Sequence, residues 1–502
     1  MARPRLTPSK CCPMASPRGR RSIARANTLD QRTSAVTEGS LWRSVATIAV
    51  PVVLTNLLQA TYQFVNGYFL GHAGRDALAA VSASAPMFGV LMALGLGLAT
   101  AGSVFIAQYA GARRTDMVDH VAAQTLLSVG AVGAGFMVIG LLGNGALIRL
   151  IGLEAEIARL THAYLSISYL GMVPMFGFMT AQAMLQSLGD ARYPLRVMIA
   201  SVVLNAVLDP ILIFGWGPVP ALGVVGAAIS TVTAQVMTCV LGLSRLASGR
   251  SGVRLRLHHF RPDLPHIRRA IGIGIPASIE QATRTFGSLV LMSLAARFGT
   301  DALAIYGLGT RIMIFFFVPM LGLSVATAAV VGQNIGAGQM ARAEAAARGT
   351  ALASFAMLTA LGLILVPLAP ALVTFLAPGE PKILAGTVHF IHIFAPCLGI
   401  MALPQVLNGA FRGAGSTRQA MGISLAMQWL MQMPCALILA LWTPLALDGV
   451  MWSFPVANVL ASLLAIGWLV WGPWRRTLIE PGAVRDAVTA LRTEVEEEIL
   501  PG

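Results

Sequence analysis

The chain has 502 residues, of which 56% are hydrophobic and only 11% are charged, whereas soluble domains carry about 25% charged residues. This composition excludes a chain of soluble domains. Long uncharged runs, for example residues 88–107 and 351–368, predict membrane helices, since a span needs about 20 apolar residues. The net charge of +14 does not indicate nucleic-acid binding, because the basic residues gather mainly in alternate connections between apolar runs.

Residues 1–40 precede the first apolar run and are basic and polar. No apolar core of a signal peptide follows the positive stretch, and we expect a disordered cytoplasmic tail. Cys11 and Cys12 in this tail are either a free pair or a lipidation site. The five cysteines of the chain show neither metal-ligand nor disulfide spacing, so we expect no metal site and no disulfide framework.

Twelve apolar runs follow, and each predicts one membrane helix. We place the helices at residues 44–70, 78–108, 121–143, 162–187, 194–215, 221–244, 267–296, 302–334, 344–376, 384–411, 417–442 and 448–472. With the N-terminus inside, the inside connections carry 15 basic residues, Arg412 among them, and the outside connections carry five. Because basic residues favour the cytoplasmic side, both termini are expected in the cytoplasm.

One stretch of the chain occurs twice. Residues 74–112 match residues 299–337 without a gap at a constant offset of 225, and 12 of the 39 positions are identical. Each copy belongs to a unit of six helices, and an even number of spans gives both units the same orientation, as in a parallel repeat. The predicted fold is an all-α polytopic membrane protein with 12 transmembrane helices in two six-helix repeats.

The repeat also predicts the division of the chain. We expect a tail at 1–40, an N-terminal six-helix lobe at 41–244, a cytoplasmic linker at 245–266, a C-terminal six-helix lobe at 267–473 and a cytoplasmic C-terminal tail at 474–502. Gly249, Gly252 and Pro262 interrupt any helix in the linker. His258 and His259, also in the linker, either bind a metal ion or lie in a solvated loop, and we expect the loop.

Few carboxylates lie within the predicted spans, and each costs at least about 2.5–3.5 kcal/mol at a helix centre. Asp209 in the fifth span follows Asn205 by four residues, which puts both side chains on one helix face. Pro210 cannot donate a backbone hydrogen bond and is expected to kink this helix, which would open carbonyls to water or a cation. The alternative is an acid that caps a local break and is simply hydrogen-bonded.

A second acid, Glu280, lies about 16 Å into the seventh span at 1.5 Å per residue, and Arg284 is one turn further on. The two form either a structural ion pair or part of a functional site. We favour the functional site, because a buried ion pair is weak evidence for stabilisation. Arg311 in the eighth span can pair with either acid.

Polar side chains mark one face of the first span, where Gln59, Gln63 and Asn66 are spaced by four and three residues. They would lack partners in lipid, and we expect them to face the protein interior. A similar set lies in the second half: Gln405, Asn408, Gln428, Gln432 and Asn458. These side chains either line a wet central cavity or join helices by hydrogen bonds.

No soluble catalytic motif is present. Gly95-Leu96-Gly97 does not follow a strand and open a phosphate loop, and no Walker-type lysine occurs. None of the eight histidines pairs with an Asp or Cys in a readable motif. We therefore expect neither an enzyme nor transport driven by ATP in this chain.

Several motifs together resemble those of the multidrug and toxic compound extrusion (MATE) family, over about residues 41–475. Residues 51–74 resemble its opening helix, and residues 205–214 its fifth-helix motif. Residues 333–338 resemble the end of its eighth helix. Residues 188–192 and 412–418 resemble its paired loops after helices four and ten.

The resemblance implies a V-shaped two-lobe exporter of the multidrug/oligosaccharidyl-lipid/polysaccharide exporter superfamily. It implies alternating access in a bacterial inner (plasma) membrane, with organic cations and other drugs expelled by antiport against H⁺ or Na⁺. No further cofactor and no nucleic-acid partner are implied; the protein would act as a monomer in contact with membrane lipid.

The resemblance also implies where the coupling site lies. One branch of the family uses an Asp on helix one, an Asn and an Asp on helix five and a Thr on helix six. Asn205 and Asp209 match the helix-five pair, Thr231 resembles the helix-six residue, and Asn66 stands where the helix-one acid would be. Another branch uses acids in helices seven, ten and twelve, of which this chain offers only Glu280, one turn from the usual position.

The expected cation-coupling residues are therefore Asp209, Asn205, Asn66 and Thr231. The expected residues for substrate or as a second acid are Glu280, Arg284, Gln59 and Gln63. An amide cannot titrate, and a desolvated Na⁺ gains less from one carboxylate than from two. We therefore predict H⁺ coupling through Asp209, with Asn66 and Asn205 as its hydrogen-bond partners.

The alternatives are a flippase for lipid-linked oligosaccharide or lipid, another solute exporter of the same superfamily, and a channel-like or receptor protein. A flippase would need a strongly cationic cavity for pyrophosphate, and the spans offer only Arg284 and Arg311 for it. A channel would show flux without dependence on a counter-ion.

Overall fold

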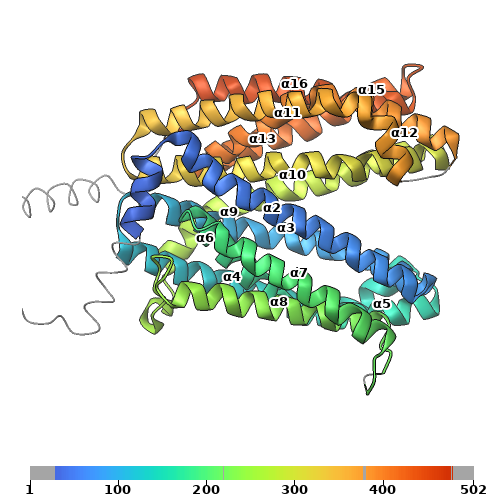
Figure 1. Ribbon diagram of the computed structural model, residues 1–502, viewed down its shortest axis with the longest axis horizontal. Coiled ribbons are helices and arrows are strands. Elements are labelled where there is room, and N and C mark those ends of the chain that lie inside the picture. Colours follow the sequence, from blue (N-terminus) through green and yellow to red (C-terminus); the bar gives the residue numbers. More distant parts are fainter. Residues whose placement is uncertain (1–28, 219, 377–379, 476–477, 479–502) are drawn as a thin grey trace, which may run out of the picture.

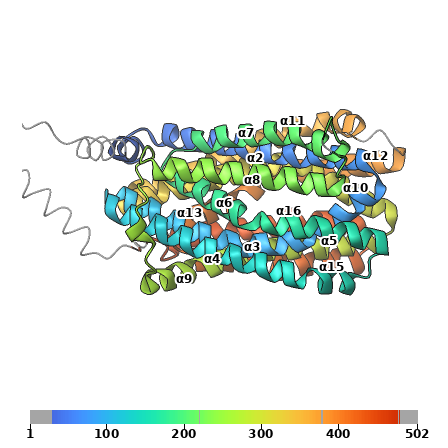
Figure 2. The same ribbon diagram turned by 90° about the horizontal axis from the view of Figure 1, so that it is seen from below.

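The computed structural model describes residues 29–218, 220–376, 380–475 and 478. Its long helices run side by side along one direction (Figures 1 and 2). The N-terminal half contains α2 (Leu41–Ala73), α3 (Arg75–Gly111), α4 (Thr115–Ile151), α5 (Ala155–Leu170), α6 (Met172–Ser187), α7 (Arg192–Phe214) and α8 (Val224–Ala247). The C-terminal half contains α9 (Leu264–Ala296), α10 (Thr300–Gly336), α11 (Met340–Leu376), α12 (Pro381–Phe394), α13 (Leu398–Gly413), α14 (Thr417–Leu425), α15 (Met433–Leu441) and α16 (Leu447–Trp471).

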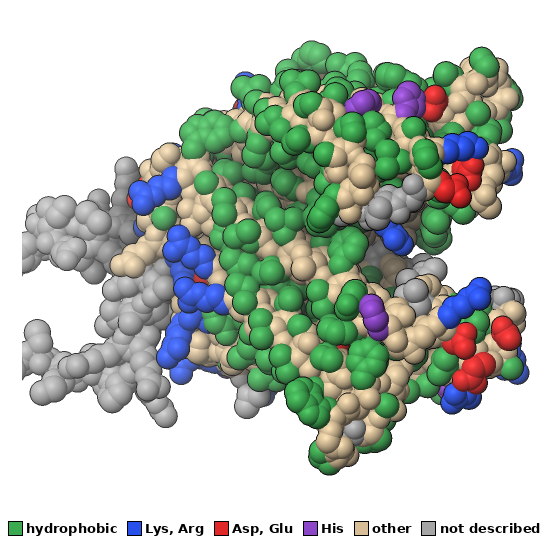
Figure 3. Space-filling view, turned by 45° about the vertical axis from the view of Figure 1, so that its right-hand side comes forward, with side chains coloured by type: hydrophobic (Ala, Val, Ile, Leu, Met, Phe, Trp, Pro, Cys, Tyr) green, Lys and Arg blue, Asp and Glu red, His purple; other side chains and the backbone are tan. Residues whose placement is uncertain are grey.

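The surface of the bundle is that of a membrane protein. Nine of the described helices, or ten spans if the bent pair α5–α6 counts as one, are long and apolar enough to cross a membrane. Leu142 and Leu430 are 82% and 75% exposed, as expected for side chains that face lipid. Charged side chains gather at the two ends of the molecule (Figure 3). The predicted all-α polytopic fold with two six-helix repeats is confirmed.

Three of the predicted spans are interrupted. The fourth is divided at Gly171 with a bend of 47°, and the tenth is divided by a short 3₁₀ segment, η2 (Ala395–Cys397). Pro396 in η2 stands at the repeat position of Gly171, so both repeats break their fourth helix at the same place. The eleventh span contains a π-helical segment, η3 (Ala426–Gln432), just before Pro434, which cannot donate a backbone hydrogen bond.

The fifth span is not interrupted. α7 stays helical from Arg192 to Phe214 across Pro210, so Asp209 does not cap a local break. The cap in the alternative interpretation is therefore wrong, whereas its hydrogen bonding of Asp209 is present.

The two repeats exchange partners at their first two helices. Gly97 of α3 lies against Gly274 and Ser278 of α9, and Gly322 of α10 lies against Val53 of α2. A methyl group on either Gly97 or Gly322 would overlap these neighbours, so small residues permit the close approach of helices. Each repeat thus packs its second helix on the first helix of the other, and the halves are joined by a pseudo-symmetric pair of contacts.

The chain before α2 differs from the predicted disordered tail. Residues 29–37 are helical, and Leu29 and Val36 are 1% and 5% exposed. Arg32 forms an ion pair of 2.9 Å with Asp190, which explains why this polar stretch is ordered. Residues 1–28 and 479–502, which include most of both predicted tails, lie outside the described residues.

The connection between the halves is also packed rather than free. Ser251 is completely buried and donates a hydrogen bond of 3.2 Å to Asp190. Asp263 caps α9, since its Oδ1 accepts a hydrogen bond of 3.2 Å from the backbone N–H of His266. This bond holds the pKa of Asp263 below its usual value. The connection contains one short 3₁₀ helix, η1 (Leu257–Phe260).

Candidate functional site

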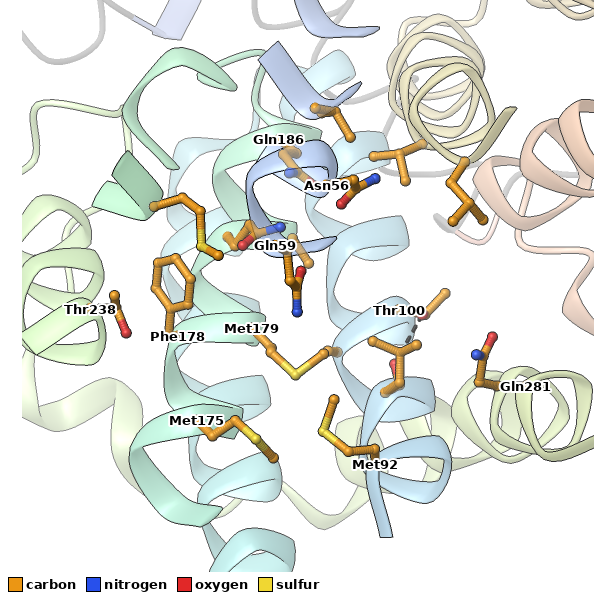
Figure 4. Close-up of a pocket in the computed structure, with 18 of the residues that line it drawn as sticks. Asn56, Gln59, Met92, Thr100, Met175, Phe178, Met179, Gln186, Thr238 and Gln281 are labelled. Atoms are coloured by element: carbon orange, nitrogen blue, oxygen red, sulfur yellow. Dashed lines mark hydrogen bonds between the residues drawn. The ribbon is translucent and has the colours of Figure 1, made fainter. Parts of the chain in front are cut away.

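A cavity of about 640 Å³ lies between the two halves. Gln59, Gln63 and Asn66 of α2 line it, and Figure 4 shows Gln59 beside Asn56 at its wall. Gln405 of α13 lines it as well. For these residues the prediction of a central cavity is confirmed. A shared helix face brings the three residues of α2 to one wall, and Gln405 reaches the cavity from the other half.

The remaining polar residues of the second half join helices. Asn408, Gln428, Gln432 and Asn458 are buried and are not among the residues that line the cavity. Asn408 Nδ2, for example, donates a hydrogen bond of 3.1 Å to Ser424 Oγ. Some of the predicted polar residues therefore line the cavity, and the others are buried between helices.

Much of the cavity wall is apolar. Met92 of α3 and Met175, Phe178 and Met179 of α6 line it, as Figure 4 shows. Phe88 of α3 lines it as well. Methionine adapts its shape and makes favourable contacts with aromatic rings. The wall therefore suits amphipathic ligands of different shape.

Asp209 and Asn205 lie on α7, which packs against α2 and α8, and neither is exposed. Asn205 Nδ2 donates to Asp209 Oδ1 at 3.2 Å, and Ser230 Oγ of α8 donates to the same oxygen. Asp209 Oδ2 and Asn205 Oδ1 are buried and have no hydrogen-bond partner among the described residues. A buried acceptor without a donor is costly, so this pair is suited to take up a proton or a small cation.

Thr231 does not join this pair, although we predicted it in the coupling site. It forms a hydrogen bond of 3.1 Å with Tyr62 of α2, and both residues line the cavity. Adjacent helical residues point about 100° apart, so Ser230 faces Asp209 while Thr231 faces the cavity. Sequence reasoning missed Ser230 and Tyr62, although Ser230 stands next to the predicted threonine.

Asn66 also differs from its predicted contact. It is 8% exposed and lines the cavity, and its Oδ1 has no partner among the described residues. No hydrogen bond joins Asn66 to Asp209 within that part of the chain. Asn205 is therefore a partner of Asp209 in this structure, and Asn66 is not.

The second acid belongs to a three-membered charge cluster. Glu280 is 1% exposed, and its Oε1 lies 2.5 Å from Arg284 NH2 and 3.2 Å from Arg412 NH1. Arg284 NH1 also donates to Gln405 Oε1 at 2.9 Å. The ion pair predicted between Glu280 and Arg284 is present, and both arginines of the cluster line the cavity. A functional role of the pair stays a prediction.

Arg412 was assigned to an inside connection on sequence grounds, and this is wrong. α13 continues to Gly413, so Arg412 is helical and reaches the cavity from the C-terminal half. Arg311 is exposed, and the described charged partners of Glu280 are Arg284 and Arg412.

The two halves meet at the end of the molecule where the helical residues 29–37 lie, at the left of Figure 1, and we call this the closed end. Gln108 Nε2 of α3 donates to the carbonyl of Gly413 at 3.2 Å. Gln333 Nε2 of α10 donates to the carbonyl of Ser187 at 2.6 Å. These glutamines occupy the same repeat position, so the repeated sequence places one bond on each side of the contact.

Two glycines allow this contact. A methyl group on Gly111 would overlap the carbonyl oxygen of Gln333, and one on Gly336 would overlap that of Gln108. The helical residues 29–37 bridge the same end, since Thr33 donates to Ala110 O at 3.5 Å and Arg342 reaches the carbonyl of Val36 at 3.4 Å.

The histidines of the connection, His258 and His259, lie in the short 3₁₀ helix η1 and not in the predicted loop. The rings of His258 and His259 are 4.0 Å apart, and His120 Nε2 lies 3.0 Å from Asp263 Oδ2. Burial, with a smaller effect of neighbouring His258, lowers the pKa of His259. No group of three or more His, Cys, Asp or Glu residues in the described part of the chain is placed to hold a metal ion.

Comparison with known proteins agrees with this architecture. The MatE family model matches residues 51–211 and 276–438. The chain is 26% identical over 439 residues to "Probable multidrug resistance protein YoeA" of Bacillus subtilis, which covers 86% of this chain and 94% of that protein.

Solved structures share the fold. One described as "Crystal structure of MATE in complex with MaL6" has a TM-score of 0.82 at 24% identity, over 92% of this chain and 99% of that chain. Another, "Outward-facing conformation of a multidrug resistance MATE family transporter of the MOP superfamily", has a TM-score of 0.81 at 24% identity, over 91% and 98%. With two family-model matches that together span more than half of its length, this chain belongs to the MatE family, the multidrug and toxic compound extrusion transporters, and is a transporter rather than an enzyme.

Proposed function

We propose that the protein is a secondary active multidrug exporter that expels amphipathic small molecules in exchange for H⁺, with Asp209 as the proton carrier. The observation that carries this proposal is the buried carboxyl group of Asp209, whose Oδ2 has no partner among the described residues. The similarity to a Bacillus subtilis protein named as a probable multidrug resistance protein supports multidrug efflux. The cavity, with both polar and apolar side chains in its wall, suits ligands of different shape.

A short path connects the proton site to the cavity. Ser230 contacts Asp209, and the next residue, Thr231, is bonded to Tyr62 at the cavity wall. Tyr62 belongs to α2, which packs on α7 of its own half and on α10 of the other half. A change in the charge of Asp209 can therefore alter both the wall and the contact between the halves.

The proposal includes alternating access. The cavity opens to one side at a time, and the contacts of Gln108 and Gln333 close the cytoplasmic side in the conformation described here. Release of these contacts would open that side. The N- and C-terminal halves would then move as the two lobes predicted from the repeat, in the inner membrane and with both termini in the cytoplasm.

The first prediction concerns this topology. On a cysteine-free background, Arg256→Cys should react with a membrane-impermeant maleimide only after the cytoplasmic side is exposed. Arg256 is exposed, whereas Ser251 nearby is buried and is unsuited to labelling. Arg159→Cys, at a side chain 69% exposed on the opposite end, is the matched control and should react in intact cells. Reaction of Arg256→Cys in intact cells would refute the orientation.

The second prediction tests the coupling ion. In proteoliposomes with H⁺ and Na⁺ gradients varied separately, efflux should follow the H⁺ gradient and ignore Na⁺ at fixed pH. Asn66→Asp adds a second carboxylate to the lobe that holds Asp209, and two nearby acids titrate as a coupled pair. This variant should shift the pH profile of transport and create a response to Na⁺. Dependence of the wild-type protein on Na⁺, or an Asn66→Asp variant with unchanged responses, would contradict H⁺ coupling through Asp209.

A lipid-linked oligosaccharide flippase remains the second candidate, because Arg412 adds a cation to the cavity that sequence analysis had not placed there. The two functions separate in the same proteoliposomes. An exporter of the proposed kind moves a water-soluble dye against its gradient, whereas a flippase moves only the lipid-linked sugar.

A further inference from the structure

The cavity carries charge of one sign. Of the described residues that line it, only Arg284 and Arg412 are charged at neutral pH. Glu280 bonds both of them but is 1% exposed and does not line the space. Asp209, the buried acid of the other half, does not line it either. Two arginines opposed by one carboxylate leave this wall with a net positive charge.

We infer that the cavity binds amphipathic organic anions, with a carboxylate, sulfonate or phosphate group held between Arg284 and Arg412, in preference to organic cations. This inference rests on the proposed export function, and it reverses the substrate charge that family resemblance implied. A cation in the same place would lie beside two guanidinium groups, and such an arrangement of like charges opposes binding.

Each of the two arginines donates two of its hydrogen bonds to the described residues and has further N–H donors. Each guanidinium has five N–H donors. Arg284 uses one on Glu280 and one on Gln405, and Arg412 uses one on Glu280 and one on Ser324. The side chains keep 28% and 19% of their surface exposed. The planar fork of unused donors fits a carboxylate or phosphate group.

A neutral donor stands next to them. Gln405 accepts from Arg284 through Oε1, while its Nε2 is buried and has no partner among the described residues. Gln405 belongs to α13, as Arg412 does, and it lines the cavity. An anionic oxygen would satisfy this amide donor together with the guanidinium groups.

The rest of the ligand would contact the apolar part of the cavity lining. The side chains of Phe88, Met92, Met175, Phe178 and Met179 provide an apolar surface that accepts flat aromatic bodies. The structure thus assigns the head of the ligand to α9 and α13 and its apolar body to α3 and α6.

The test compares two dyes with the same xanthene ring system and opposite charge: fluorescein, an anion at pH 8, and rhodamine 123, a cation. Their affinities are measured by fluorescence polarisation with purified protein in phosphatidylcholine nanodiscs, which offer no anionic lipid as a competitor. Empty nanodiscs give the background. Fluorescein should bind at least about tenfold more tightly, and its affinity should fall as salt concentration rises.

Variants separate ligand binding from a merely structural charge cluster. Arg412→Gln should weaken fluorescein by about tenfold or more, the usual effect of a lost charge-assisted bond, and Arg412→Lys should keep part of the affinity. Glu280→Gln removes the competing carboxylate and should strengthen fluorescein binding. Thermal unfolding of each variant checks that it is folded, and the double variant Glu280→Gln/Arg412→Gln, which removes one charge of each sign, serves if Arg412→Gln does not fold. It should bind fluorescein less tightly than Glu280→Gln alone.

The inference is overturned if rhodamine 123 binds more tightly than fluorescein, or if a folded Arg412→Gln variant keeps the wild-type affinity for fluorescein. The proposed function fails in a different way. Fluorescein that binds as described but is never moved by an ion gradient would refute export and leave the anion site intact. Gradient-driven export of rhodamine 123 without fluorescein binding would support export and refute the anion site.

Discussion

Asp209→Asn is expected to abolish efflux driven by a proton gradient, to the level of liposomes without protein, while leaving a folded protein that still binds substrate. The amide has almost the shape of the acid and can accept from Ser230 and Asn205 as the carboxylate does. It cannot exchange a proton. The variant therefore removes titration and keeps the contacts that position α7 against α8.

The measurement is dye efflux from proteoliposomes with an imposed pH gradient, with substrate binding and thermal unfolding measured on the same preparation. Ser230→Ala is the matched control. It removes one donor to Asp209 Oδ1 but leaves the carboxyl group, and should reduce efflux only partly, since a hydrogen bond to a charged group contributes about 1.5–3 kcal/mol. Undiminished efflux by Asp209→Asn would remove this acid from the mechanism.

Gly336→Ala is expected to prevent the halves from meeting at the closed end and to reduce transport about fivefold or more. The new methyl group would overlap the carbonyl oxygen of Gln108, and backbone atoms cannot move aside as a flexible side chain can. Forcing extra atoms into such a contact costs about 1–3 kcal/mol, which corresponds to a shift of about 5- to 150-fold in a two-state equilibrium. Gly111→Ala should act alike, because its methyl group would overlap Gln333.

Accessibility reports the shift directly. Ala107 lines the cavity near the closed end and is 1% exposed. Ala107→Cys should react slowly with a maleimide added from the cytoplasmic side, and much faster when Gly336→Ala is also present. Gly307→Ala on the same helix, where a methyl group meets no atom within 4 Å, should change neither transport nor reactivity. Full transport by Gly336→Ala with unchanged reactivity of the cysteine would show that this contact is not a gate.

The general design could be predicted from sequence because it follows from local chemistry. A helix in lipid must satisfy its own backbone, so each long apolar run becomes a span wherever it packs. The polar face of Gln59, Gln63 and Asn66 reached the cavity for a similar reason, since helical spacing alone puts the three side chains on one side. The repeat was visible because matched residues keep a constant offset.

Contacts between distant segments could not be obtained this way. Only the folded chain shows that Ser230, and not Thr231, faces Asp209, because a rotation of 100° between neighbours decides which residue points where. Only the folded chain places Arg412 beside Glu280, which turns an isolated ion pair into a cavity wall with excess positive charge. In the same way, the apolar runs by themselves determined the twelve helices. The packing of α3 on α9 and of α10 on α2 was decided only in the folded chain, because it depends on Gly97 and Gly322, which let these helix pairs approach closely.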